Sequence, residues 1–177
     1  MRKLFSIPSG KCLTRHTWRS NLTWKSAFLG GFLLTISAVL VRMLSGPPYG
    51  VYIMVRQIHS LPPLILLLSL HLLLIFGMGA AVGIIMIDYR PYVYAAKYRA
   101  GMFFVIQITV YLAVYPLIFQ SVMPRMALLF LILSFMLSLL CLKQFFEIRP
   151  LCGCIALIFS AWQFYMILLL LGCLLRI

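Results

Sequence analysis

Acidic side chains are almost absent from this sequence. Its 177 residues include two carboxylates, Asp88 and Glu147, against fifteen lysines and arginines, which gives a formal net charge of +13. Chemistry that needs paired carboxylates, acidic metal ligands or a relay of Asp and Glu is therefore disfavoured. Charged residues make up 10% of the chain and hydrophobic residues 64%, so polar side chains are too few to cover a soluble core. This composition predicts an integral membrane protein.

The basic excess could also mark a nucleic-acid-binding protein, but its placement argues against that function. Six lysines and arginines precede the first apolar run, and nearly all the others lie at the ends of such runs. Basic side chains there set the orientation of membrane helices and contact lipid headgroups. We therefore expect membrane lipids, and no nucleic acid, among the partners.

Five apolar stretches have lengths that suit membrane-spanning helices. They lie near residues 26–44, 62–86, 101–123, 126–142 and 151–175. We predict an all-α fold, an integral membrane bundle of five transmembrane helices in residues 26–177, after a basic N-terminal tail in residues 1–25. The first connection, residues 45–61, is long and rich in proline and glycine, so we predict that it forms a lid over the bundle.

The distribution of basic residues also predicts an orientation. Eleven lysines and arginines lie in the tail and in the connections on its side of the membrane, and four lie on the other side. The positive-inside rule then predicts a cytoplasmic N-terminus. The acid-free, Ser- and Thr-containing tail is also typical of a mitochondrial transit peptide. We expect a multi-pass protein of the bacterial cell membrane, with a mitochondrial membrane as the alternative.

Candidate reactive side chains are few. The five cysteines fit no zinc or redox pattern, so we interpret them as packing residues and predict neither a metal site nor catalytic residues. His71 lies inside the second apolar run, where an ionisable side chain is a functional candidate. The alternative is a neutral imidazole that is hydrogen-bonded to a neighbouring helix. We expect a protein that is not an enzyme.

Small residues at Gly79 and Gly83 form a GxxxG segment in the second run. Such segments let two helix backbones approach closely, either within one chain or across a dimer, and the sequence leaves both open.

The third run carries an amide among aromatic rings. Phe104, Tyr111 and Tyr115 stand at i−3, i+4 and i+8 from Gln107, so they share one helix face. Such a face suits an amphipathic, ring-shaped ligand that stacks on the rings and is oriented by the amide. Simple packing of aromatic side chains is the alternative.

The spacing of several residues resembles that of the TspO/MBR family, the translocator protein and tryptophan-rich sensory proteins. The resemblance extends from about residue 51 to residue 167 and rests on Tyr52, Pro62-Pro63, Met78-Gly79, Gln107, Pro116 and Ala161-Trp162. His71 stands where the family has a Trp, Tyr111 where it has an Asn and Phe130 where it has an Asp. Most of the tryptophans that give the family its name are absent.

The resemblance implies a five-helix bundle, often a homodimer, that binds a hydrophobic small molecule in an aromatic-lined pocket. The ligand would be porphyrin-like (a tetrapyrrole), sterol-like or lipidic, bound for sensing, sequestration or transport, and no cofactor would be required. The predicted ligand-binding residues are Gln107, Trp162, Phe104, Tyr111, Tyr52 and His71. The alternative is a structural or assembly subunit of a membrane complex without a small-molecule ligand.

Overall fold

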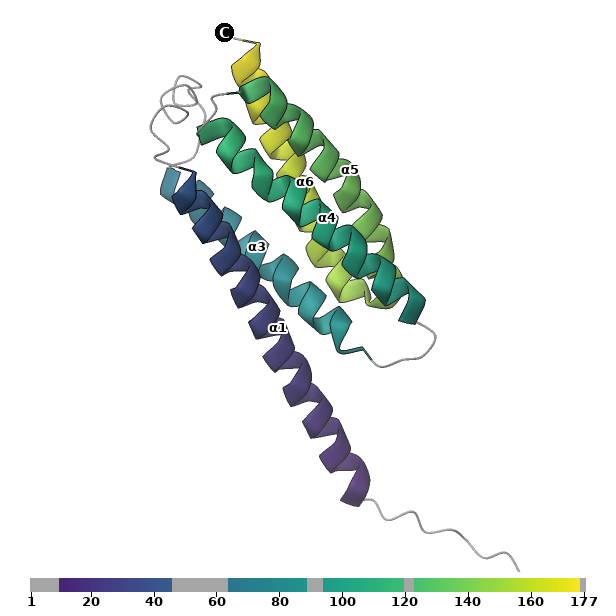
Figure 1. The fold of residues 1–177 in the computed structure, drawn as a ribbon. Helices are drawn as coiled ribbons and strands as arrows, with labels where there is room; N and C mark the ends of the chain where they lie inside the picture. The colour runs from purple at the N-terminus through teal and green to yellow at the C-terminus, as the bar shows by residue number, and fades with distance from the viewer. Residues whose placement is uncertain (1–9, 46–63, 89–93, 120–122, 176–177) are drawn as a thin grey trace, which may run out of the picture.

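Five long helices make up nearly all of the described chain. The computed structural model describes residues 10–45, 64–88, 94–119 and 123–175. The helices are α1 (Gly10–Leu44), α3 (Leu64–Met86), α4 (Tyr94–Phe119), α5 (Pro124–Ile148) and α6 (Pro150–Leu174) (Figure 1). Each contains a stretch of 19 to 25 residues that is long and apolar enough to cross a membrane, and no strand occurs within the described ranges. The predicted all-α bundle of five membrane helices is confirmed.

The helix ends differ from the apolar runs because hydropathy marks the membrane-embedded part of a helix and not its full length. The helix α1 begins at Gly10, although its candidate span begins at Thr23, and its first part projects beyond the other helices (Figure 1). The helix α4 begins at Tyr94, before the apolar run, and continues through Pro116 to Phe119. The predicted lid, residues 45–61, lies outside the described residues except for Ser45.

Proline and extended backbone separate α5 from α6. Arg149 has φ −148° and ψ 117°, and Pro150 follows as the first residue of α6. The proline ring disfavours helical backbone at the preceding residue but suits the first position of a helix, where no N–H donor is needed. The chain therefore reverses within one residue, and α5 and α6 pack side by side as an antiparallel pair.

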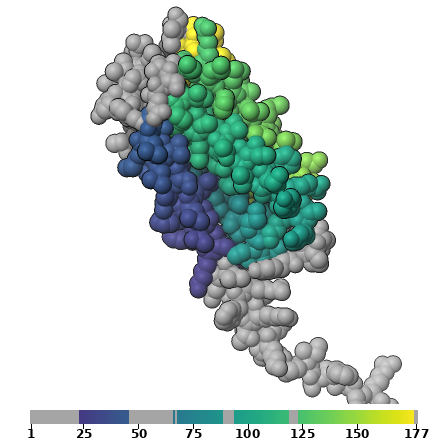
Figure 2. Space-filling model, in the orientation of Figure 1, coloured from purple at the N-terminus to yellow at the C-terminus, as the bar shows by residue number. Residues whose placement is uncertain are grey.

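The helices form two groups. The first is the α1–α3 pair, and the second consists of α4, α5 and α6, in which α5 packs against both α4 and α6. The two groups meet mainly where α3 packs against α6, with smaller contacts of α4 with α1 and α3. On the face drawn in Figure 2, side chains close the space between α1 and α4.

Glycines allow the close approach of α1 and α3. A methyl group added at Gly79 would lie 2.9 Å from the Cα atom of Gly31 and against the carbonyl oxygen of Gly30. A methyl group at Gly83 would meet the carbonyl oxygen of Ser26 in the same way. The GxxxG face is therefore occupied by α1 of the same chain, and it gives no support to the predicted homodimer.

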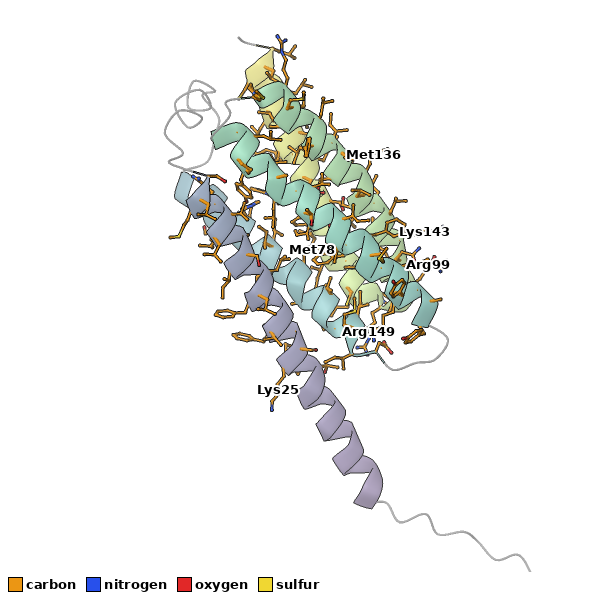
Figure 3. All side chains as sticks on the ribbon, in the orientation of Figure 1. Lys25, Met78, Arg99, Met136, Lys143 and Arg149 are labelled. Atoms are coloured by element: carbon orange, nitrogen blue, oxygen red, sulfur yellow. The ribbon has the colours of Figure 1, made fainter. Side chains whose placement is uncertain are left out.

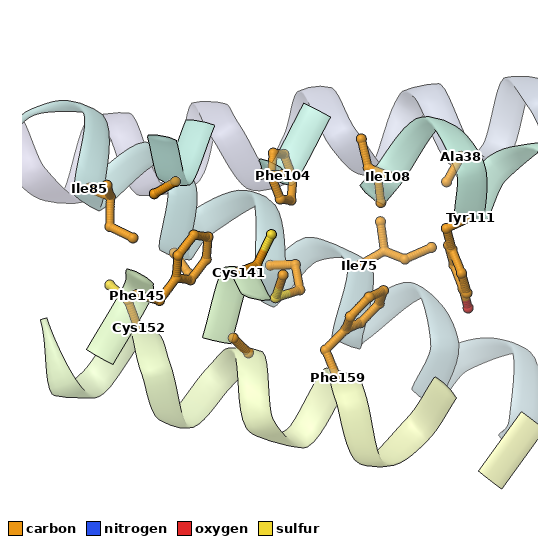
Figure 4. Close-up of a cluster of buried hydrophobic side chains, with 14 of the residues drawn as sticks. Ala38, Ile75, Ile85, Phe104, Ile108, Tyr111, Cys141, Phe145, Cys152 and Phe159 are labelled. Carbon is orange, nitrogen blue, oxygen red and sulfur yellow. The ribbon is translucent and has the colours of Figure 1, made fainter. Parts of the chain in front are cut away.

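Large apolar side chains cover the outside of the bundle, and the interior combines large apolar side chains with small ones. Side chains such as Trp24, Phe28 and Leu73 are 77%, 66% and 65% exposed, as expected where a helix faces lipid, and Figure 3 shows side chains projecting outward along all five helices. The core includes Cys141 and Cys152, which are fully buried as free thiols beside Phe145 (Figure 4). Both cysteines pack as small apolar residues.

An ion pair joins the two groups of helices at one end of the bundle. Arg149, between α5 and α6, donates through Nε to Oδ2 of Asp88, just after α3, at 3.0 Å. The carboxylate side chain is only 3% exposed, whereas the arginine is 41% exposed. The basic residues Lys25, Arg99 and Lys143 lie toward the same end (Figure 3), which is the end that the charge distribution predicts to face the cytoplasm.

Candidate functional site

A histidine inside the bundle joins three helices through hydrogen bonds. Nε1 of Trp162, on α6, donates to Nδ1 of His71, on α3, at 3.0 Å. The hydroxyl of Tyr111, on α4, lies 3.1 Å from the same nitrogen, and the hydroxyl of Tyr115 is hydrogen-bonded to Nε2. We call His71, Tyr111, Tyr115 and Trp162 the His71 cluster. His71, Tyr111 and Trp162 are 7%, 4% and 8% exposed, so the cluster is built almost entirely inside the protein.

The hydrogen bonds define the tautomer of the imidazole. An indole N–H can only donate, so Nδ1 of His71 must be the acceptor, and a neutral ring then carries its proton on Nε2. The Nε2–H group donates to the Tyr115 hydroxyl, while the Tyr111 hydroxyl shares Nδ1 with Trp162. A doubly protonated ring would direct an N–H at the indole N–H, so the cluster fits the neutral imidazole. This arrangement, a neutral imidazole hydrogen-bonded to a neighbouring helix, is the alternative interpretation of His71 that the sequence left open.

Ring contacts hold the same side chains in place. The His71 ring centroid is 5.7 Å from that of Tyr111, 5.9 Å from Tyr115 and 6.0 Å from Trp162. Phe159 packs edge-on against Tyr111 at 5.3 Å. These separations are within the range of favourable aromatic pairs. The cluster thus combines flat apolar faces with hydrogen-bonding edges and contains no formal charge.

The cluster lies toward the end of the bundle where α1 ends and α3 begins. His71 is about 10 Å along α3 from Leu64, at 1.5 Å per residue. Arg42, in the last turn of α1, is a neighbour of Tyr115. In sequence, the connection that we predict to act as a lid joins these two helix ends. The cluster is therefore nearer to that end of the bundle than to the end with Asp88 and Arg149.

The structure brings together three of the six predicted ligand-binding residues: His71, Tyr111 and Trp162. Phe104 does not join them, because it lies seven residues from Tyr111 along α4 and packs in the apolar core (Figure 4). Gln107 is fully buried, and its carboxamide makes no hydrogen bond to the cluster or to any other described residue. Tyr52 lies outside the described residues.

A second set of buried polar groups lies beside the backbone of Gln107, and apart from Gln107 none of its residues was predicted as a site residue. Gln163, on α6, donates through Nε2 to Oγ of Ser134, on α5, at 2.8 Å, and Ser134 donates to the backbone oxygen of Gln107 at 3.3 Å. One turn away, the hydroxyls of Ser138 and Ser160 are 3.0 Å apart. We call these five residues the polar seam. A sequence signal existed, since Ser134 and Ser138 are four residues apart within an apolar run and Gln163 is in the middle of another.

The His71 cluster is better suited to hydrogen bonding and stacking than to metal binding. Within the described ranges, no group of three or more His, Cys, Asp or Glu side chains could hold a metal ion. The lone pair of His71 Nδ1 accepts from Trp162, and Nε2 carries a proton, so neither nitrogen is free to coordinate.

No protein-family model matches the chain, and no curated protein or solved structure matches it either. The resemblance to the TspO/MBR family therefore stays a prediction from the spacing of residues.

Proposed function

We propose that this multi-pass membrane protein is a TspO/MBR-like ligand-binding protein. It binds a porphyrin-like, sterol-like or lipidic molecule inside its helix bundle, for sensing, sequestration or transport. The His71 cluster is the observation that carries the proposal, because Tyr111 and Trp162 are 40 and 91 residues from His71 in sequence and still contact it. The family resemblance predicts ligand contacts at these same three residues.

The chemistry of the cluster suits a flat, mostly apolar ligand with a few polar groups. Aromatic faces offer stacking area, and the indole N–H and the two tyrosine hydroxyls offer directed hydrogen bonds. In the described state these groups bond to His71. A ligand that enters between α3, α4 and α6 would take over some of these hydrogen bonds, so it needs an acceptor group that reaches Trp162 or a tyrosine.

Binding is a better match than catalysis for this site. The chain has two side-chain carboxylates. Asp88 follows the end of α3, which is about 22 Å along the helix from His71, and Glu147 lies in the last turn of α5. Asp88 is already paired with Arg149. The imidazole therefore lacks a carboxylate that would orient it as a general base.

Titration with protoporphyrin IX tests the proposal. The full chain, reconstituted in lipid nanodiscs, carries Trp18→Phe and Trp24→Phe so that Trp162 is its single tryptophan. We expect saturable quenching of Trp162 fluorescence. His71→Leu removes the acceptor that competes with the ligand for the indole and tyrosine donors, so the dissociation constant should fall roughly tenfold, the equivalent of about 1.4 kcal/mol. A sterol that competes for the site should reverse the quenching.

A variant on the same helix provides the matched control. Phe164 is 50% exposed, so Phe164→Leu changes an outward-facing aromatic side chain and should leave the dissociation constant unchanged. Quenching that never saturates, or that responds equally to Phe164→Leu and His71→Leu, would mean that the porphyrin partitions into lipid and does not bind the cluster.

The proposal includes a bacterial cell membrane as the location and a homodimer as the assembly. The alternative is a structural or assembly subunit without a ligand, and the Gly79 and Gly83 face that such a subunit would offer to a partner packs against α1 in the same chain. Crosslinking in native membranes separates the two, since a homodimer gives one product of twice the chain mass and a complex subunit gives products with other proteins.

A further inference from the structure

The carboxamide of Gln107 is the least expected polar group in this bundle. The residue is 0% exposed, in the middle of α4, and neither Nε2 nor Oε1 has a hydrogen-bond partner among the described residues. A primary amide can donate two hydrogen bonds and accept two. Burying such a group without partners is costly, and most so in a membrane, where lipid cannot supply them.

A third unpartnered atom belongs to Gln163, which is also part of the polar seam. The hydroxyl hydrogen of Ser134 is donated to the backbone oxygen of Gln107, so its oxygen must accept from Gln163. This requirement directs Nε2 of Gln163 toward Ser134 and leaves Oε1 of Gln163 without a partner. Gln163 is also 0% exposed. Ser134 hydrogen-bonds to the Gln163 amide and to the backbone oxygen of Gln107, so both glutamines lie beside Ser134, between α4, α5 and α6.

We propose that this region is a binding site for water, held by the carboxamides of Gln107 and Gln163. A water molecule that accepts from Nε2 of Gln107 and donates to Oε1 of Gln163 pairs two of the three unpartnered atoms, and a second water donates to Oε1 of Gln107. Buried waters typically make two to four hydrogen bonds to groups of this kind. Both glutamines are fully enclosed, so the bound molecule must be small. The surrounding side chains are neutral and do not favour an ion.

The site gives the group of α4, α5 and α6 a continuous polar connection. Ser134 already joins α5 to both neighbouring helices, and the water joins α4 directly to α6. Ordered water is a general means of satisfying polar groups inside membrane helix bundles. The inference does not depend on the His71 cluster or on any ligand, so a failed porphyrin titration would leave it unchanged.

Nuclear magnetic resonance of the full chain in detergent micelles tests the site directly. Selective ¹⁵N labelling of glutamine gives five side-chain amide groups, and Gln107→Met identifies the Gln107 signals by their loss. We expect a cross-peak between the Gln107 amide protons and water, with the sign of a long-lived complex. The cross-peak should persist with a gadolinium chelate in the solvent, which suppresses signals from exposed amides.

Thermal unfolding of the same variant gives an independent measurement. Gln107→Met removes the partner of the water and leaves Oε1 of Gln163 unpaired, so Tm should fall by about 2–4 °C. If no water is bound at the Gln107 amide, its replacement by an apolar side chain of similar size removes the cost of burying an unpaired amide, and Tm should rise. Ile106→Met, at a 47% exposed neighbour, is the matched control and should leave Tm unchanged.

The two measurements lead to clear outcomes. A long-lived water cross-peak at Gln107 together with a lowered Tm supports the site. Absence of the cross-peak in the folded protein overturns the proposal, and so does a Tm that rises in Gln107→Met. If that variant does not fold, the signals are assigned with Gln163→Met and by elimination, and the cross-peak of the unsubstituted chain decides.

Discussion

Replacing either tyrosine of the His71 cluster by phenylalanine removes one hydroxyl and keeps the ring. The two hydroxyls bond to different nitrogens of the imidazole. The Tyr111 hydroxyl shares Nδ1 of His71 with Trp162, which donates at 3.0 Å, whereas Nε2 has the Tyr115 hydroxyl as its partner within the described residues. Tyr115→Phe therefore leaves a buried N–H group unpaired, and Tyr111→Phe does not. We expect the less buried tyrosine to contribute more to stability.

The magnitudes follow from the partners that remain. Leaving a buried donor unsatisfied costs about 1–3 kcal/mol. Tyr111→Phe removes one of two donors to the same nitrogen and should cost about 0.5 kcal/mol, near the average for hydrogen bonds between membrane helices. For a chain of this size, 1 kcal/mol corresponds to about 2–4 °C in Tm.

Thermal unfolding in a single detergent, followed by circular dichroism, measures the difference. Tyr165→Phe is the matched control, because Tyr165 is 36% exposed and its ring contacts Trp162 without a hydrogen bond to the cluster. Its Tm should stay within about 1–2 °C of the parent, since exposed substitutions change stability by about 0.5 kcal/mol or less. A larger loss for Tyr111→Phe than for Tyr115→Phe would refute the assignment of the imidazole proton to Nε2.

Two further substitutions test how the helices are joined. Gly79→Leu should lower the free energy of unfolding by about 1–3 kcal/mol, because the side chain would force α1 away from α3. Its control is Gly172→Leu, where a Cβ atom meets nothing within 4 Å. The control should show no measurable change in thermal unfolding. Asp88→Asn should cost about 1.5–3 kcal/mol, the range for hydrogen bonds to charged groups, whereas Glu147→Gln, at an exposed residue, should leave Tm unchanged. Equal effects within either pair would contradict the corresponding contact.

The number and type of helices could be predicted from the sequence because a bilayer leaves the chain little choice. A segment that crosses hydrocarbon must satisfy its own backbone hydrogen bonds, so a sufficiently long apolar run is a helix. Where a helix ends is a separate matter. Helix α1 extends to Gly10 through a polar segment that carries no hydropathy signal, and α5 continues to Ile148, past Lys143 and Glu147.

The candidate site was predictable only in part, because sequence spacing gives the face of one helix and not its neighbours. Gln107 and Tyr111 are four residues apart and share a face of α4. The Tyr111 side chain contacts α3 and α6, whereas the Gln107 backbone meets Ser134 on α5. Which neighbour each residue meets depends on the rotation of α4 against three other helices. The GxxxG segment shows the same limit, since its partner surface at Gly30 and Gly31 could be identified only from the packed structure.

The two groups of helices are held together by polar contacts at two depths. Asp88 and Arg149 join them at one end, and the His71 cluster joins α3 to α4 and α6 toward the other. Lipid tails are as apolar as leucine, so apolar surface alone gives membrane helices little reason to associate, and packing and hydrogen bonds carry more of the association. Under the proposed function, a ligand that takes over hydrogen bonds of His71 would loosen the groups at the cluster while the ion pair keeps them together at the far end. The ligand would then enter by a local separation of α3 from α4 and α6, with the rest of the bundle intact.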